Sequence, residues 1–90
     1  MDIDGALRSE IHLKIMAFFH ENQSSIDTPR GIATWIREER GKVKRALEDL
    51  ARIKVLIAHR APSTTGYSYT RDSKIISRID RFLIKKKRSA

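Results

Sequence analysis

The sequence contains no cysteine, which excludes both a disulfide framework and a metal site built on thiolates. Its four glycines stand singly, so the chain has no glycine-rich loop of the kind that holds nucleotide phosphates. No apolar run approaches the roughly 18 residues that a membrane-spanning helix requires. The N-terminal segment MDIDGALRSE is acidic, unlike a basic secretory signal. We therefore expect a cytoplasmic protein that does not interact with membranes.

The chain of 90 residues is long enough for one small core, and we expect a single domain that spans residues 1–90. Charged residues make up 33% of the sequence, against an average of about 25%, so most of the surface is ionic. Aromatic residues make up only 7%, which leaves the core to a few aliphatic stripes and three phenylalanines. We expect no enzyme-sized pocket in a domain with so small a core, and the sequence contains no nucleophile elbow. We therefore predict that the protein is not an enzyme.

Histidine is the remaining residue type that could indicate a metal site. His12, His20 and His59 lie far apart, and no carboxylate cluster joins them at ligand spacing. We therefore predict no metal and no cofactor. No segment remains for a separate effector domain, so we also predict no small-molecule effector.

Positive charge is concentrated in the second part of the chain, although the overall charge is +8. Residues 1–39 contain four Lys or Arg and seven Asp or Glu, a net charge of −3. Residues 40–90 contain fifteen Lys or Arg and four Asp or Glu, a net charge of +11. A basic region of this kind attracts polyanions and binds phosphate backbones in a salt-dependent way. The alternative is a solvated basic surface that only keeps the protein soluble.

The segment GIATWIREERGKVKRALEDLARIKVLIAHR, residues 31–60, has the apolar spacing of two short helices. Between them, residues 37–41 form a polar break. Pro29, which follows Asp27 and Thr28, suits the first turn of a helix, where a backbone N–H is not needed. We predict a helix-turn-helix with helices over residues 28–37 and 40–53. The apolar positions are Ile32, Ala33 and Ile36 in the first helix and Val43, Ala46, Leu47 and Leu50 in the second.

The predicted helix-turn-helix is followed by the apolar residues Val55-Leu56-Ile57, which are typical of the start of a strand. Over residues 27–70, this arrangement resembles the winged-helix regulators of bacteria and archaea. In that family a small residue at the position of Ala33 lets the two helices approach, and the second helix reads DNA. Two positions differ, since Glu38 stands where a small aliphatic residue is usual and Lys54 where glycine is often found. The resemblance implies a mainly α fold with a small β-hairpin, built from a three-helix core, a β wing and an extra C-terminal helix. It also implies a small transcription regulator that binds double-stranded DNA.

The polar face of the second helix supplies the predicted DNA contacts. A rotation of 100° per residue puts its polar residues opposite the apolar stripe. Arginine and lysine on such a face can donate to guanine in the major groove. The predicted base-facing residues are Lys44, Arg45, Gly41 and Glu48, and the predicted phosphate contacts from the same helix are Arg40, Lys42 and Arg52. Glu48 either pairs with Lys44 one turn away, which we favour, or accepts from a cytosine amino group.

Residues 55–70 predict a hairpin, because two stretches rich in β-branched or aromatic residues flank the turn-rich link of residues 61–66. In the family that it resembles, such a wing lies against the DNA backbone or the minor groove, so we predict phosphate contacts from Arg60 and Arg71. The alternative is an ordinary hairpin that only completes the core. Ile26 is predicted to form a short first strand that pairs with the hairpin. Trp35 is predicted to be a half-buried packing residue rather than a platform for base stacking.

Two terminal helices complete the prediction, one over residues 4–21 and one over residues 73–87 with Asp72 as its N-cap. The first has a main apolar stripe and a second apolar side formed by Leu13 and Met16. The stripe of the last helix either covers that second side in the same chain or joins it in a homodimer interface, and we favour the dimer. The predicted interface consists of Leu13, Met16, Ile75, Ile76, Ile79, Phe82 and Leu83.

The basic tail, residues 85–90, contains Lys85, Lys86 and Lys87 and is interpreted as a flexible phosphate-binding arm or a disordered solubilising end. Two alternatives to a DNA-binding regulator stay open at this level. One is a winged-helix module for protein interaction or assembly, whose basic face meets an acidic protein. The other is an RNA-binding domain, which shares the same charge.

Overall fold

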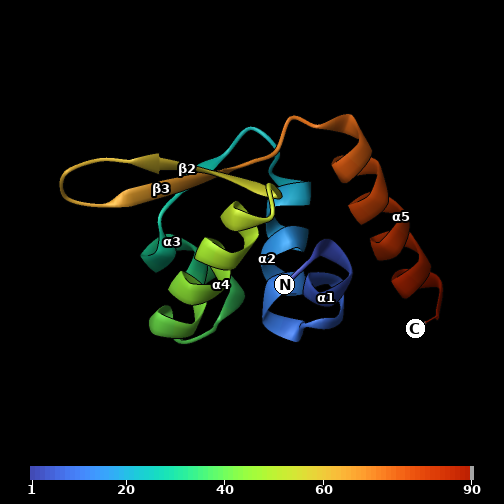
Figure 1. The fold of residues 1–90 in the computed structure, drawn as a ribbon. Helices are drawn as coiled ribbons and strands as arrows, with labels where there is room; N and C mark the ends of the chain where they lie inside the picture. The colour runs from blue at the N-terminus through green and yellow to red at the C-terminus, as the bar shows by residue number, and fades with distance from the viewer. Residues whose placement is uncertain (90) are drawn as a thin grey trace.

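The computed structural model describes residues 1–89 and contains five helices and a three-stranded antiparallel sheet (Figure 1). The strand order is β1-β3-β2. Ala90, the last residue of the predicted basic tail, lies outside the described residues. The predicted mainly α class with a small hairpin is confirmed. The elements are α1 (Ile3–Arg8), α2 (Glu10–Glu21), β1 (Ile26–Asp27), α3 (Pro29–Ile36), α4 (Arg40–Arg52), β2 (Leu56–Arg60), β3 (Thr65–Tyr69) and α5 (Ser73–Ser89).

The core is organised around α2, which contacts α3, α4, α5 and β3. Ile15, Met16 and Phe19 of this helix are completely buried. From α4, Leu47 and Leu50 are also completely buried, and each such side chain contributes about 1.5–3 kcal/mol relative to leaving it in water. The apolar stripes that predicted α3 and α4 are therefore the faces that these helices turn toward α2.

The predicted helix-turn-helix is present as α3 and α4, and both helices have a side-chain cap. The Thr28 hydroxyl accepts from the N–H of Gly31 at 3.2 Å, and Pro29 occupies the first turn of α3. The chain leaves α3 at Arg37, which has a left-handed conformation with φ 58°. Glu39 then caps α4. The turn between the helices therefore consists of residues 37–39.

The prediction of one continuous helix over residues 4–21 is wrong, because the chain bends at Ser9. This residue is extended (φ −92°, ψ 123°), with α1 before it and α2 after it. Serine competes with the helical backbone for hydrogen bonds and favours helix ends. Here its hydroxyl forms a 2.6 Å hydrogen bond with His12 Nδ1. The apolar spacing from Leu7 to Ile11 stays helical across the bend, so periodicity alone did not reveal it.

The hairpin pairs Leu56 with Tyr69 at its base and Arg60 with Thr65 near its tip. The prediction that Ile26 forms a short first strand is confirmed, because β1 pairs Ile26 with Ser68 of β3. Tyr67 and Tyr69 share one face of β3 and are both buried. The tip of the hairpin extends away from the helices, as Figure 1 shows.

The last helix packs within its own chain. On α5, Ile79 is completely buried, while Ile75, Ile76, Phe82 and Leu83 are partly buried. On α2, the facing Met16 is completely buried and Leu13 nearly so. Met16 and Ile79 are therefore inaccessible to a partner chain. We predicted that the stripe of the last helix either packs within its own chain or forms a homodimer interface, and the first alternative explains the burial of these two residues. Lys85, Lys86 and Lys87 belong to α5, which continues to Ser89, rather than to a flexible tail.

Polar contacts hold α5 in the same place. His20 of α2 forms hydrogen bonds with Asp80 Oδ1 of α5, at 2.8 Å, and with the Tyr69 hydroxyl, at 3.2 Å. Arg78 pairs with Asp4 of α1. These contacts add directional constraints to the apolar packing of α5 on α2.

Replacing Lys54 with glycine is expected to stabilise the fold. Lys54 follows α4 with φ 69°, a conformation that costs an ordinary residue about 1–2 kcal/mol because of its Cβ. Its N–H donates to the Ala51 carbonyl at 3.1 Å, so the backbone is held there. Glycine also raises the conformational entropy of the unfolded chain, which offsets part of this gain. We therefore expect the free energy of unfolding, measured by urea titration, to rise by about 1 kcal/mol. Lys54→Ala keeps the Cβ and is the control, and an equal response of the two variants would contradict this explanation.

Candidate nucleic-acid interface

Of the predicted base-facing residues, Gly41, Lys44 and Glu48 line the side of α4 next to the hairpin, whereas Arg45 lines its other flank, toward α2. Lys44, Arg45 and Glu48 are exposed and Gly41 is half-buried, whereas the apolar residues of the helix face α2. In Figure 1, α4 lies at the surface below the hairpin. A helix with one free polar side next to a projecting hairpin can enter a groove of a nucleic acid.

An open groove separates this side of α4 from the hairpin. The start of α3 and the tip of the hairpin close its two sides. The charged residues that line it are Arg30, Glu39, Arg40, Lys44, Glu48 and Arg60. Four cations against two carboxylates make the groove basic, so it attracts phosphate groups. The structure therefore brings together Arg40, Gly41, Lys44, Glu48 and Arg60 from the predicted site.

Arg30 is a residue of this groove that the sequence did not suggest. It lies in the acidic first part of the chain, where no charge excess draws attention to it. The exposed Arg30 reaches the groove because the first turn of α3 borders it. The available signal was its position one residue after the helix-starting proline.

Glu39 is the N-cap of α4 and lines the groove. Its carboxylate accepts from the N–H groups of Gly41, at 2.7 Å, and Lys42, at 3.1 Å. These two hydrogen bonds lower the pKa of Glu39, so it is ionised at neutral pH. A Cβ at Gly41 would lie 2.8 Å from Glu39 Oε1. The absence of a side chain at Gly41 therefore makes room for the Glu39 carboxylate that caps α4.

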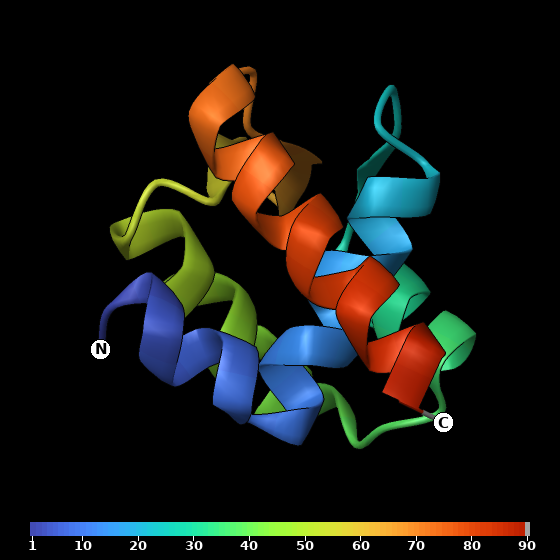
Figure 2. The same cartoon turned by 90° about the vertical axis from the view of Figure 1, so that its right-hand side faces the viewer.

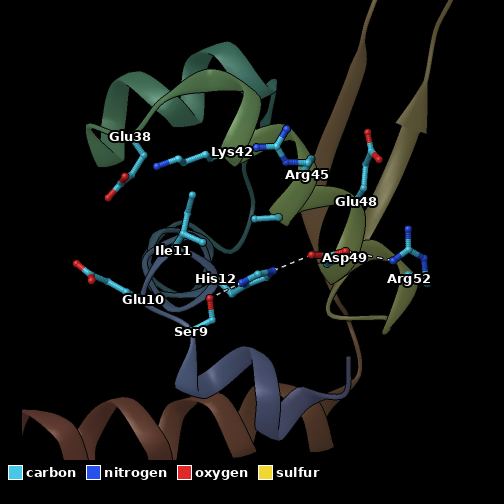
Figure 3. Close-up of a pocket in the computed structure, with 11 residues that line it drawn as sticks. Ser9, Glu10, Ile11, His12, Glu38, Lys42, Arg45, Glu48, Asp49 and Arg52 are labelled. Carbon is cyan, nitrogen blue, oxygen red and sulfur yellow. Dashed lines mark hydrogen bonds and ion pairs between the residues drawn. The ribbon is translucent and has the colours of Figure 1, made fainter.

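The other flank of α4 faces α2 and carries Lys42, Arg45 and Arg52 (Figure 3). A chain of hydrogen bonds joins the two helices here. His12 Nε2 lies 3.0 Å from Asp49 Oδ2, and Arg52 donates to Asp49 Oδ1 at 3.1 Å. Sequence reasoning missed this link because His12 and Asp49 are 37 positions apart. Arg52 is therefore partly neutralised, unlike Lys44 and Arg45.

The favoured pairing of Glu48 with Lys44 is wrong for the described residues, where no ion pair joins the two side chains. Both are exposed and border the groove. The Glu48 charge is felt instead by Tyr67, whose phenol pKa is raised by burial and by this carboxylate. The carboxylate of Glu48 is thus available to a ligand of the groove.

Several predicted site residues lie elsewhere. Arg71 lies at the end of the hairpin away from its tip, two residues after β3 and two residues before α5. Lys85, Lys86 and Lys87 are on α5, on the opposite side of the molecule from the hairpin (Figure 1). Trp35, predicted to be half-buried, is 71% exposed, because α3 turns this flank away from the core.

Acid is expected to weaken the α2–α4 link in a measurable way. The hydrogen bond from His12 lowers the pKa of Asp49 from its ordinary 3.8. A carboxylate with a lowered folded pKa adds stability that is complete above the unfolded value and is lost as the pH falls through the folded one. Between pH 4 and pH 2, the wild type should therefore lose free energy of unfolding more steeply than Asp49→Asn, in urea titrations at each pH. Parallel curves for the two proteins would show that Asp49 is not coupled to folding.

None of the helices within residues 1–89 is long and apolar enough to cross a membrane. Within the same range, no group of three or more His, Cys, Asp or Glu side chains is arranged to hold a metal ion.

Comparison with solved structures assigns the architecture. AntR, an antimony-specific transcriptional repressor, superposes with a TM-score of 0.78 over 94% of this chain and 74% of its own, at 15% identity. The chain has the winged-helix fold. HlyU from Vibrio cholerae gives a TM-score of 0.70 over 87% of this chain and 80% of its own, at 13% identity. MepR, a transcription regulator of the Staphylococcus aureus multidrug efflux pump MepA, gives 0.70 over 90% and 62%, at 13% identity. No family model and no curated protein matches the sequence.

In the winged-helix fold, α3 and α4 form the helix-turn-helix and the β2–β3 hairpin is the wing. The basic groove described above is therefore the space between α4 and the wing. At identities of 13–15%, the similarity concerns the fold and not the ligand of each regulator.

Proposed function

We propose that the protein is a small transcription regulator that binds duplex DNA through α4 and the wing. The observation that carries this proposal is the basic groove, where cations of α3, α4 and β2 surround the free side of the recognition helix. Two solved structures that share the fold, AntR and MepR, are described as a transcriptional repressor and a transcription regulator, which supports the same function. A regulator of this type requires neither catalysis nor a cofactor and acts in the cytoplasm.

The roles of individual residues follow from their chemistry. Lys44 and Arg45, exposed on α4, donate to guanine O6 and N7 in the major groove. Glu48, which lacks an ion-pair partner among residues 1–89, accepts from a cytosine amino group. Arg40 and Lys42 at the helix start and Arg60 on the wing neutralise phosphates, and Arg30 joins them from α3.

A single recognition helix contacts only a few base pairs, so useful specificity requires two half-sites about one DNA turn apart. We propose that the protein binds DNA as a homodimer with two-fold symmetry. The symmetry of the dimer then matches the symmetry of its site. Its mass in solution should be twice the 10.4 kDa of one chain.

The wing and the end of α5 are expected to differ in their effect on DNA affinity. Arg60→Ala should weaken binding to all duplexes about equally and reduce the slope of log affinity against log salt by roughly one unit, as for one lost phosphate contact. Lys87→Ala, in the last turn of α5 and outside the groove at α4, should leave that slope unchanged. Fluorescence anisotropy with labelled duplexes at several salt concentrations measures both. A reduced slope for Lys87→Ala would mean that the basic end of α5 also binds phosphate.

Binding of wild-type protein to random duplex DNA and to single-stranded RNA, each over a salt titration, tests the proposal as a whole. We expect tighter binding to duplex DNA and a steep decrease with salt. Tighter binding to the RNA than to the duplex would indicate that the partner is RNA and not DNA. An affinity that does not change with salt would contradict every nucleic-acid function.

A further inference from the structure

The strand β2 forms a free edge of the sheet. The strand order β1-β3-β2 leaves one side of β2 without a neighbouring strand among the described residues. In Figure 2, α5 lies in front, across α2, and the hairpin points away from the viewer, so α5 does not cover this edge. The strand contains no proline, which is one of the devices by which proteins block pairing at an edge. The proposed DNA contacts do not use its backbone.

The hydrogen bonds of the hairpin show which backbone groups of β2 point away from the sheet. At the base, the N–H of Thr70 donates to the Val55 carbonyl at 3.0 Å, and at the tip the N–H of Ala61 donates to the Thr64 carbonyl at 3.0 Å. In an antiparallel pair, bonding to the neighbouring strand recurs at every second residue. The residues between these positions therefore direct their N–H and C=O groups outward. They are Leu56, Ala58 and Arg60.

The outer face of the sheet is apolar next to this edge. Ile57 of β2 is 41% exposed and lies opposite Ser68 of β3. Ile26 of β1 lies opposite the same serine from the other side and is 64% exposed. Residues directly opposite each other share one face of a sheet, so the two isoleucines form one row with Ser68 between them. A strand added beside β2 would extend this row.

The other face beside the edge is basic. A groove separates β2 from the C-terminal half of α4, and Ala51 and Leu56 belong to its apolar lining. Its charged lining consists of one carboxylate and three cations, a net charge of +2: Glu48, Arg52, Lys54 and Arg60. Arg52 donates to Asp49, but neither Lys54 nor Arg60 forms an ion pair within residues 1–89. The outward backbone groups of β2 therefore lie between an apolar row and a basic groove.

We propose that β2 binds an extended segment of another protein as a fourth strand, and that this segment alternates apolar and acidic residues. Successive side chains of a strand point to opposite faces, so the apolar set lies beside Ile57 and the acidic set lies at the groove with Lys54. The backbone of the segment pairs with the outward N–H and C=O groups of β2. Main-chain hydrogen bonds supply the affinity of such a complex, and the side-chain positions on the two faces supply its specificity.

The charge of the groove decides between the possible occupants. A second copy of this chain would bring its own Lys54 and Arg60 against the same cations, so two β2 edges repel each other. A nucleic acid fits the cations, but its charged backbone would lie against Ile57 and leave the outward carbonyl groups unpaired. An acidic strand matches the cations, the apolar row and the backbone groups together. It is therefore the occupant that the edge favours.

Synthetic peptides and the full chain test the proposal. The probe is a fluorescein-labelled peptide of alternating valine and glutamate, about as long as β2. Fluorescence anisotropy should show saturable binding. A block peptide of the same composition, with all glutamates before all valines, cannot place its charges on one face and should bind at least about tenfold more weakly. In the complex, amide hydrogen exchange measured by NMR should slow at the three outward groups, those of Leu56, Ala58 and Arg60.

Two pairs of variants test the backbone and the charge separately. Ala58→Pro removes an outward N–H and should weaken peptide binding at least about tenfold, whereas Ala58→Ser keeps the N–H and should bind like the wild type. Lys54→Glu should weaken binding about tenfold through repulsion. Lys74→Glu makes the same change of net charge on α5, outside the groove, and should have no effect.

The exchange measurement on the wild type keeps the test decisive even if Ala58→Pro does not fold. No binding of the alternating peptide, equal binding of the block peptide, or unchanged exchange at the three amides would overturn the proposal. Slower exchange at these amides with duplex DNA but not with the peptide would also overturn it, because the edge would then belong to the DNA interface. Since the peptide experiments contain no DNA, their outcome does not depend on the proposed function.

Discussion

Arg45→Ala is expected to lower the preference of the protein for its selected DNA site over competitor DNA by roughly ten- to a hundredfold. The reason is that a bidentate contact from arginine to guanine contributes about 1–3 kcal/mol of discrimination. Arg45 is exposed and lies outside the α4 core formed by Val43, Leu47 and Leu50, so its removal should leave folding nearly intact. Site selection from a random duplex library, followed by competition binding at one fixed salt concentration, measures the loss.

Two variants separate base reading from general attraction. Lys42→Ala removes a cation at the start of the same helix, and as a phosphate contact it should weaken site and competitor together. Lys74→Ala removes an exposed cation of α5 and should change neither affinity. If Arg45→Ala kept the full preference for the selected site, this side of α4 would not read bases.

Ile79→Ala is expected to reduce the free energy of unfolding by about 2–5 kcal/mol, a large part of the stability of so small a domain. Ile79 is completely buried within one chain, where α5 packs on α2. The loss combines the transfer free energy of the removed atoms with the cavity that they leave. Urea unfolding at low protein concentration, where a dimer is dissociated, measures the effect on the single chain.

Ile84→Ala is the matched control, because Ile84 lies on the same helix and is 44% exposed. Its removal should cost much less stability than that of Ile79. If both variants unfolded at the same urea concentration as the wild type, α5 would not belong to the core of the single chain. Phe82→Ala combined with Ile79→Ala should enlarge the loss, since Phe82 packs against the same core.

The sequence alone predicted those parts of the fold that depend on local pattern. Apolar spacing placed α3 and α4, because each buries one stripe against α2 and has polar residues on its other side. Pro29 and Thr28 marked the start of α3 for the same local reason. The short pairing of Ile26 with the hairpin was predicted from a single β-branched residue.

The errors concern interactions between distant residues or choices that periodicity does not distinguish. At the bend, Ser9 forms a side-chain hydrogen bond with His12, while the apolar spacing on either side of the bend stays helical. The exposure of Trp35 depends on how far α3 turns on α2, which no local pattern encodes. Lys44 and Glu48 have the spacing of an ion pair but do not form one among the described residues, because both side chains border an open groove.

The candidate site was predictable in its helix and its charge but not in its boundaries. The helical rotation of 100° per residue identified the outer side of α4, where Lys44, Arg45 and Glu48 are exposed. It could not show that Arg30 of α3 borders the same groove, since that contact depends on the crossing of the two helices. Nor could it show that Lys86 and Lys87 line a groove at α5 instead, far from the wing.

The most direct test of the central claim, that α4 and the wing bind duplex DNA, is the salt dependence of wild-type binding to the duplex selected from a random library. With Arg30, Arg40, Lys44 and Arg60 around one groove, we expect log affinity to fall linearly with log salt. The slope should be about −0.9 for each phosphate contact. Affinity for the selected duplex should also exceed that for competitor DNA at every salt concentration. Failure to select any sequence, together with an affinity independent of salt, would contradict the account.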